Sequence, residues 1–73
     1  MRLKIVLDTM QDVKNFVDTV SRVNAPVFLS DGAHQQVCAT SQLGAIFAKM
    51  EWSEIYCLCE TDISGKIMTW LAD

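Results

Sequence analysis

The residues of this chain that are best suited to chemistry are three cysteines and one histidine: Cys38, Cys57, Cys59 and His34. The cysteines have none of the Cys-x-x-Cys spacings that bind zinc or exchange thiols. Cys57 and Cys59 are two residues apart in an alternating segment, so a strand would place them on one face. They would serve either as part of a metal or thiol site with His34 or as small hydrophobic residues in the core. We favour the core and expect no metal and no cofactor.

A second group of polar residues lies at positions 8–12. Asp8 is followed three residues later by Gln11, and Thr9 is followed three residues later by Asp12. Both pairs have the spacing of a capping box, which starts a helix. The helix that follows has one apolar stripe, formed by Val13, Phe16, Val17 and Val20, and it should end before Pro26. These polar side chains are therefore expected at a helix N-terminus.

The remaining elements follow from changes in hydrophobic period. Alternating or β-branched segments predict strands at residues 3–7, 27–29, 35–39 and 54–59, with Asp31-Gly32 as a hairpin turn between the middle two. A second helix is expected from residue 41, capped by Thr40, with a buried stripe of Leu43, Ile46, Phe47 and Met50. A third, capped by Thr61 or Asp62, would bury Ile63, Ile67, Trp70 and Leu71.

This order predicts the fold class. The 73 residues suffice for one domain with one core, covering residues 1–73. The elements run strand, helix, strand, strand, helix, strand, helix, and each helix has a single apolar stripe. We therefore expect an α+β protein of βαββαβα order, an open-faced sandwich in which three helices cover one face of a four-stranded antiparallel sheet.

Composition excludes nucleic acid and membranes as partners and favours other proteins. The net charge is −3 and the six basic residues are scattered, which excludes a nucleic-acid surface. No apolar run approaches the roughly 20 residues that cross a membrane, and the start is too short for a signal peptide, so we expect a cytoplasmic protein. The hydrophobic content of 51% is high for so small a chain, which implies exposed apolar surface and protein partners.

Two segments resemble a known family. Asn15-Phe16-Val17 is similar to the Gln-Phe-Val of the first helix of HPr, the histidine-containing phosphocarrier of the phosphoenolpyruvate-dependent sugar phosphotransferase system. Residues 37–44, Val-Cys-Ala-Thr-Ser-Gln-Leu-Gly, resemble that family's passage from strand to helix, in which a serine precedes an apolar residue and a Leu-Gly or Met-Gly pair. The resemblance extends over nearly the whole chain and implies the same open-faced sandwich.

The resemblance also implies a lost activity. It places Thr9 at the position of the phosphorylated histidine and Gln11 at that of the adjacent arginine. A phosphohistidine needs an imidazole nitrogen as nucleophile, and carboxylates in the same turn would repel a phosphoryl donor. We therefore expect a non-catalytic regulatory or protein-binding member of the family and not an enzyme. The alternative is an unorthodox phosphocarrier that uses Asp8, Asp12 or His34 as acceptor.

Ser41 falls where HPr proteins of some bacteria carry a regulatory serine that a kinase modifies. The resemblance makes Ser41 the candidate for phosphorylation, because a phosphate there would lie at the start of the second helix. The other interpretation is an ordinary capping residue beside Thr40.

Strand alternation also predicts an interface. If Ile55, Cys57 and Cys59 face the helices, Tyr56 and Leu58 point to the open side of the sheet, as does Val6. An open sheet face is normally polar. We therefore expect a homodimer through Val6, Tyr56 and Leu58.

Overall fold

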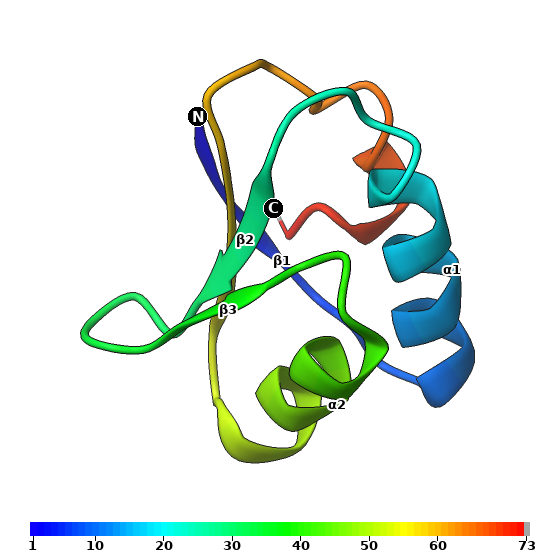
Figure 1. Cartoon of the computed structure of the whole chain (residues 1–73). Helices are drawn as coiled ribbons and strands as arrows, with labels where there is room; N and C mark the ends of the chain where they lie inside the picture. Colours follow the sequence, from blue (N-terminus) through cyan, green and yellow to red (C-terminus); the bar gives the residue numbers. More distant parts are fainter. Residues whose placement is uncertain (73) are drawn as a thin grey trace.

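The sheet of the computed structural model, which describes residues 1–72, has four strands in the order β1-β4-β2-β3, and every neighbouring pair is antiparallel. The elements in chain order are β1 (Arg2–Ile5), α1 (Met10–Val20), β2 (Val27–Ser30), β3 (Gln36–Cys38), α2 (Gln42–Glu51), β4 (Ile55–Cys59) and a short 3-10 helix, η1 (Met68–Trp70). Figure 1 shows both α-helices on the same side of the sheet. The prediction of an α+β chain with an open antiparallel sheet is confirmed. The sheet carries two α-helices, whereas three were predicted.

Helix α1 forms as its sequence predicts. Thr9 is the N-cap, and its hydroxyl oxygen accepts a hydrogen bond from the Asp12 main-chain N–H at 3.0 Å. The Asp12 carboxylate accepts in return from the Thr9 N–H at 3.2 Å, which completes a capping box. All four residues of the predicted apolar stripe are buried, and Phe16 and Val20 are fully buried. Local signals at the cap and along the helix agree here, so the prediction is confirmed.

The buried face of α2 differs from the prediction. The core receives Ala45 and Ala48, both fully buried, whereas Leu43 is 82% exposed, Phe47 44% and Met50 71%. A Cβ added at Gly44 would come within 3.2 Å of the Cys38 carbonyl oxygen, which shows that the helix lies close to β3. Only small side chains fit into so narrow a space. The predicted burial of Leu43, Phe47 and Met50 is therefore wrong, and Ile46 alone of that stripe packs against the core, half-buried.

The predicted third helix is also wrong. Residues 61–72 form turns and the three-residue η1, after which Leu71 pairs antiparallel with Ile5. The Val6 N–H donates to the Trp70 carbonyl at 2.8 Å, and the Ala72 N–H donates to the Lys4 carbonyl at 3.0 Å. The end of the chain thus extends the sheet at the β1 edge. Ile63, Ile67 and Trp70 are nevertheless buried as predicted, because turns can direct apolar side chains inward without a regular helix. Leu71, also predicted to be buried, is half-buried against the core.

The buried residues form one core between the sheet and the helices. The sheet contributes its helix-side residues, among them Ile5, Leu29 and Cys57. The ring of Trp70 meets that of Phe16 edge to face, with 5.4 Å between the centroids, so η1 packs beneath α1. None of the helices in residues 1–72 has the length and apolar character needed to cross a membrane.

Candidate functional site

The start of α1 is where the resemblance would place a phosphoryl acceptor. One carboxylate oxygen of Asp12 accepts from the N–H groups of Asp8, at 3.1 Å, and Thr9, at 3.2 Å. The Gln11 side chain points along the helix and donates to Asn15 at 3.0 Å. The main-chain donors that precede the helix are thus already bonded to a carboxylate. This arrangement caps a helix and offers no imidazole to a phosphoryl donor.

One cation lies near this turn that sequence reasoning missed. The Lys49 ammonium on α2 donates to the main-chain carbonyls of Leu7 and Asp8, at 2.9 Å each. These contacts join residues 41 and 42 positions apart in the chain, so no local pattern could reveal them. The ammonium bonds the carbonyl of Asp8 and not its carboxylate. Lys49 therefore holds residues 7–8, the segment that leads into α1, against α2.

Ser41 is the N-cap of α2, so the interpretation of Ser41 as a capping residue is confirmed and the cap predicted at Thr40 is wrong. Its hydroxyl oxygen accepts from the Gly44 N–H at 3.2 Å, and its side chain is exposed. A groove of about 410 Å³ lies between this end of α2 and the side of α1, lined by Lys14, Asn15, Val17, Asp18, Ser21, Thr40 and Gln42. The hydroxyl of Ser41 is thus both a structural cap and accessible to solvent.

His34 is exposed in the hairpin loop, residues 31–35. Asp31 closes this loop, because its carboxylate accepts from the N–H of Ala33 at 2.8 Å and from that of Gln35 at 3.1 Å. The same hydrogen bonds hold the pKa of Asp31 below its ordinary value. Figure 1 shows the loop and α1 on opposite sides of the molecule. The structure does not bring His34 near Asp8 or Asp12.

The cysteines do not gather into a site. Cys57 and Cys59 are buried on the helix side of β4, while Cys38 is exposed on β3. Burial raises the pKa of Cys57 to about 11. The Thr40 hydroxyl, 3.0 Å from the Cys38 sulfur, lowers the pKa of Cys38. Residues 1–72 contain no group of three or more His, Cys, Asp or Glu side chains that could hold a metal ion.

The open face of the sheet carries two cross-strand rows. One row is Arg2, Leu58, Phe28 and Cys38, and the other is Lys4, Tyr56, Ser30 and Gln36. Tyr56 is partly covered, because the Arg2 guanidinium lies 4.3 Å from its ring centroid, and its hydroxyl donates to Glu54 at 2.8 Å.

The structure brings together two of the three residues predicted for an interface. Tyr56 and Leu58 share the open face, half-buried. Val6 is 44% exposed but follows β1. Leu58 pairs with Arg2, four residues before Val6, which is about 13 Å along the strand. The apolar part of the open face is therefore centred on Leu58 and Phe28, and Val6 lies apart from it.

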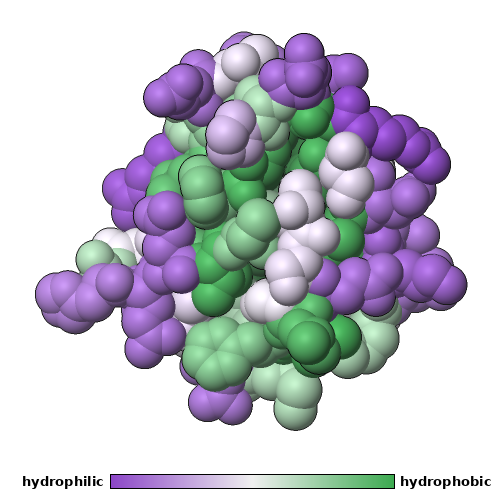
Figure 2. Space-filling model, viewed as in Figure 1, coloured by the Kyte–Doolittle hydropathy of each residue, from purple (hydrophilic) through white to green (hydrophobic). Residues whose placement is uncertain are grey.

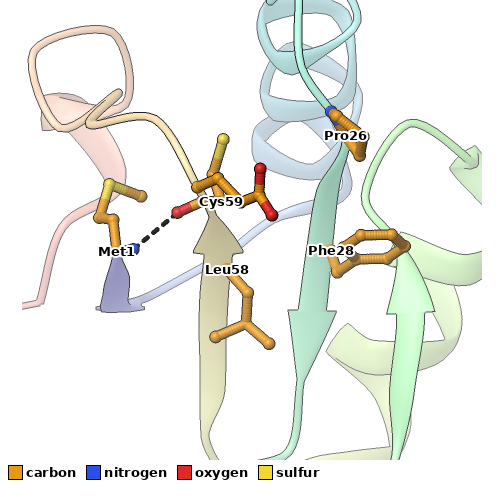
Figure 3. A pocket seen from close by; sticks show the side chains of 6 residues that line it. Met1, Pro26, Phe28, Leu58 and Cys59 are labelled. Carbon is orange, nitrogen blue, oxygen red and sulfur yellow. Dashed lines mark hydrogen bonds between the residues drawn. The ribbon is translucent and has the colours of Figure 1, made fainter.

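Beside these two residues the surface is hollowed. A hollow of about 400 Å³ is lined by Met1, Pro26, Phe28, Leu58, Cys59 and Glu60. Figure 3 shows the Phe28 and Leu58 side chains rising from adjacent strands, and it marks the hydrogen bond from the Met1 amine to the Cys59 carbonyl, 2.7 Å long. The lining of this hollow is mainly apolar.

Three of the exposed large hydrophobic residues lie on the outer side of α2. Leu43, Phe47 and Met50 follow the i, i+4, i+7 spacing and so lie on one side of the helix. Figure 2 shows hydrophobic residues gathered over α2, at the bottom of the view. The Phe47 ring meets Trp52 edge to face, with 6.0 Å between centroids, which holds the middle residue of this stripe in place. We call these three residues the α2 stripe.

Comparison with family models, with curated proteins and with solved structures found no match for this chain.

Proposed function

We propose that this chain is a cytoplasmic, HPr-like regulatory protein that binds protein partners of the phosphoenolpyruvate-dependent sugar phosphotransferase system without carrying phosphate on histidine. The observation that carries the proposal is the exposed α2 stripe. Leu43 and Met50 are 82% and 71% exposed on a helix that buries only alanines fully. An isolated exposed apolar residue is normal in a small protein, but three on one side of one helix form a binding surface.

The chemistry of the stripe fits a protein partner. Leucine, phenylalanine and methionine at i, i+4 and i+7 are the anchors by which a helix enters an apolar groove, and methionine adapts to irregular surfaces. Residues 32–48, which include Leu43 and Phe47, contain no Asp, Glu, Lys or Arg, whereas Met50 stands between Lys49 and Glu51. Depletion of charge around aromatic and methionine side chains is typical of the centre of a protein interface. The stripe therefore favours recognition of a protein over recognition of a small anion.

The start of α1 supports the absence of histidine phosphotransfer. Thr9 is engaged as a cap and Asp12 already accepts two main-chain hydrogen bonds there. A phosphoryl group arriving at this turn would meet the carboxylates of Asp8 and Asp12, and the basic group at hand, Lys49, is bonded to carbonyls.

Ser41 supplies a means of regulation. A phosphate on its exposed hydroxyl would add a charge of about −1.5 to −2 at the N-terminus of α2, where main-chain N–H groups can receive it. Leu43, in the first turn of the same helix, belongs to the α2 stripe. Modification of Ser41 would therefore change the charge of the binding surface while favouring the helix.

The test uses the general phosphotransferase enzyme, purified, with labelled phosphoenolpyruvate and Mg²⁺. The chain should bind this enzyme in calorimetric titration and should remain unlabelled. Leu43→Ser with Met50→Ser should abolish binding, whereas Met68→Ser, at a residue that is 67% exposed but lies outside α2, should not. An acid-labile, base-stable label on His34, or a wild-type chain that does not bind the enzyme, would contradict the proposal.

A second candidate function rests on Lys49. Phosphoryl transfer to aspartate needs a lysine and Mg²⁺ beside the carboxylate. The Lys49 ammonium is in the same turn, 2.9 Å from the Asp8 main-chain carbonyl oxygen, and would have to exchange this bond for one to the Asp8 carboxylate. We propose Asp8 as the acceptor in this alternative. In the same labelling experiment it predicts a label that base and hydroxylamine release and that is lost in Asp8→Asn. Retention of the label in Asp8→Asn would exclude it.

A further inference from the structure

The two edges of the sheet differ in a way that bears on self-association. The β1 edge is occupied, since Leu71 pairs with Ile5 and is flanked by hydrogen bonds from Val6 to Trp70 and from Ala72 to Lys4. The other edge is β3, which ends the strand order. Within residues 1–72, no strand covers its outer side. The fold thus has one edge closed by its own chain and one edge open.

The main-chain groups on the open edge can be assigned from the β2–β3 register. Ala39 donates to Val27 and Asp31 donates to Gln35, so these pairs are hydrogen-bonded, and by alternation so is Leu29 with Val37. Gln36 and Cys38 are then in non-hydrogen-bonded positions with respect to β2. Their main-chain N–H and C=O groups point outward, although the Cys38 carbonyl also accepts from the Ser41 N–H at 3.2 Å. These groups match the spacing that another antiparallel strand offers.

The edge is protected against pairing only by its shortness. Edge strands are blunted by being very short or by carrying a lysine, a proline, an inward-pointing charge or a bulge, and β3 is short, with three residues, but carries no charge and no proline. β3 consists of Gln36, Val37 and Cys38, and it lies within the uncharged stretch 32–48. The net charge of −3 opposes the approach of a second copy of the chain. At this edge a second copy would meet no like charge.

We propose that β3 pairs with β3 of a second copy, antiparallel about a twofold axis at Val37, to form a continuous eight-stranded sheet. Gln36 of each copy then forms a hydrogen-bonded pair with Cys38 of the partner subunit. The two Val37 side chains meet on the helix side as a non-hydrogen-bonded pair, in which side chains lie closest. Because the β1 edge is closed, pairing stops at two copies. This interface is independent of the α2 stripe and of the proposed function.

The extent of the contact sets the expected affinity. Strands of three residues bury less than the about 1,200 Å² that stable interfaces require, even with the Val37 pair and neighbouring side chains. A reversible dimer at high micromolar concentration is therefore expected, in place of a permanent one.

The test is sedimentation velocity of the full chain from low micromolar to millimolar concentration. The apparent mass should rise from 8.2 kDa towards twice that value. Gln36→Pro removes an outward N–H that β2 does not use, so it should keep the chain monomeric without unfolding it. Cys38→Lys adds a charge to the same edge and should likewise keep the chain monomeric. Circular dichroism and urea unfolding establish that both variants are folded.

Two further arms make the register testable. Val37→Cys in a Cys38→Ser chain should form a disulfide-linked dimer on mild oxidation, because the two positions oppose each other directly. Leu58→Ser, on the open sheet face, should dimerise like the wild type. A wild type that stays monomeric at millimolar concentration would overturn the proposal. So would dimerisation that Leu58→Ser abolishes and Gln36→Pro leaves unchanged, because it would place the interface on the open face.

Discussion

Gly32 lies directly against the ring of Tyr56, so that a Cβ added at Gly32 would come within 2.7 Å of the ring atom Cε2. The hairpin loop therefore curls over the open face of the sheet, and the glycine permits it by adopting a φ of +87°. With Arg2 stacked on the same ring, Tyr56 fixes both the loop and the start of β1.

Gly32→Ala should lower the free energy of unfolding by about 1–3 kcal/mol, since alanine is strained at positive φ and its methyl group would displace the Tyr56 ring. The measurement is urea unfolding followed by circular dichroism. Gly65→Ala is the matched control, because a Cβ there has no atom within 4 Å. That variant should be unchanged or more stable by up to about 1 kcal/mol. Equal effects of the two substitutions would argue against the contact with Tyr56.

The packing of α2 gives the second prediction. Ala48→Leu adds volume where the helix meets the core and should destabilise the protein by about 1–3 kcal/mol. Leu43→Ala removes a side chain that is 82% exposed and should change stability by less than about 0.5 kcal/mol. Thermal unfolding of both variants checks the orientation of the helix. If Leu43→Ala destabilised the protein more than Ala48→Leu, α2 would have the orientation that the apolar stripe predicts.

That orientation shows what sequence can and cannot specify. Helix α1 was predicted correctly because Thr9, Asp12 and the apolar stripe are local and mutually consistent. In α2 two patterns compete, one of large apolar residues and one of Gly44, Ala45 and Ala48. Apolar periodicity selects the large residues, whereas the narrow space beneath β3 admits only the small ones. The distance between layers is a tertiary property that no window of sequence contains.

Contacts between segments distant in sequence also explain the wrong prediction of a third helix and the missed contact of Lys49. The final helix was predicted from a stripe whose buried members are real, but the main chain of residues 70–72 is bonded to β1, far away in sequence. Lys49 was missed as a neighbour of Asp8 for the same reason. The two faces predicted for residues 55–59 from strand alternation are confirmed, since Cys57 is buried and Tyr56 points to the open face.

Thiol reactivity gives the third prediction. Cys38 is exposed and the neighbouring Thr40 hydroxyl lowers its pKa, so a larger share of it is thiolate near neutral pH. Limiting iodoacetamide should label Cys38 alone in the native protein. Cys57 and Cys59 should react only after unfolding, because both are buried. Mass spectrometry of the peptides locates the label, and Thr40→Val should slow the reaction at Cys38. Early labelling of Cys57 in the folded chain would contradict the described core.

The buried thiol of Cys57 also predicts how stability depends on pH. Burial raises its pKa from the ordinary value of 9.0 to about 11, because the thiolate cannot be solvated in the core. Below pH 9 the thiol is neutral in both folded and unfolded chains, so its full contribution to stability is present. Between pH 9 and 11 the unfolded chain loses this proton while the folded chain keeps it, which favours unfolding. The free energy of unfolding should therefore fall as pH rises through this window, by up to about 3 kcal/mol from this group.

Urea unfolding of the wild type and of Cys57→Ala, compared at pH 8 and at pH 10.5, isolates the contribution of that thiol. The variant leaves a small cavity and is less stable at both pH values, but its stability should fall less steeply, since it lacks this thiol while its other residues are the same. The difference between the two pH dependences measures the raised pKa directly. Parallel pH profiles would show that the Cys57 thiol titrates alike in the folded and unfolded chains, and they would place this residue outside the core that β4 forms with the helices.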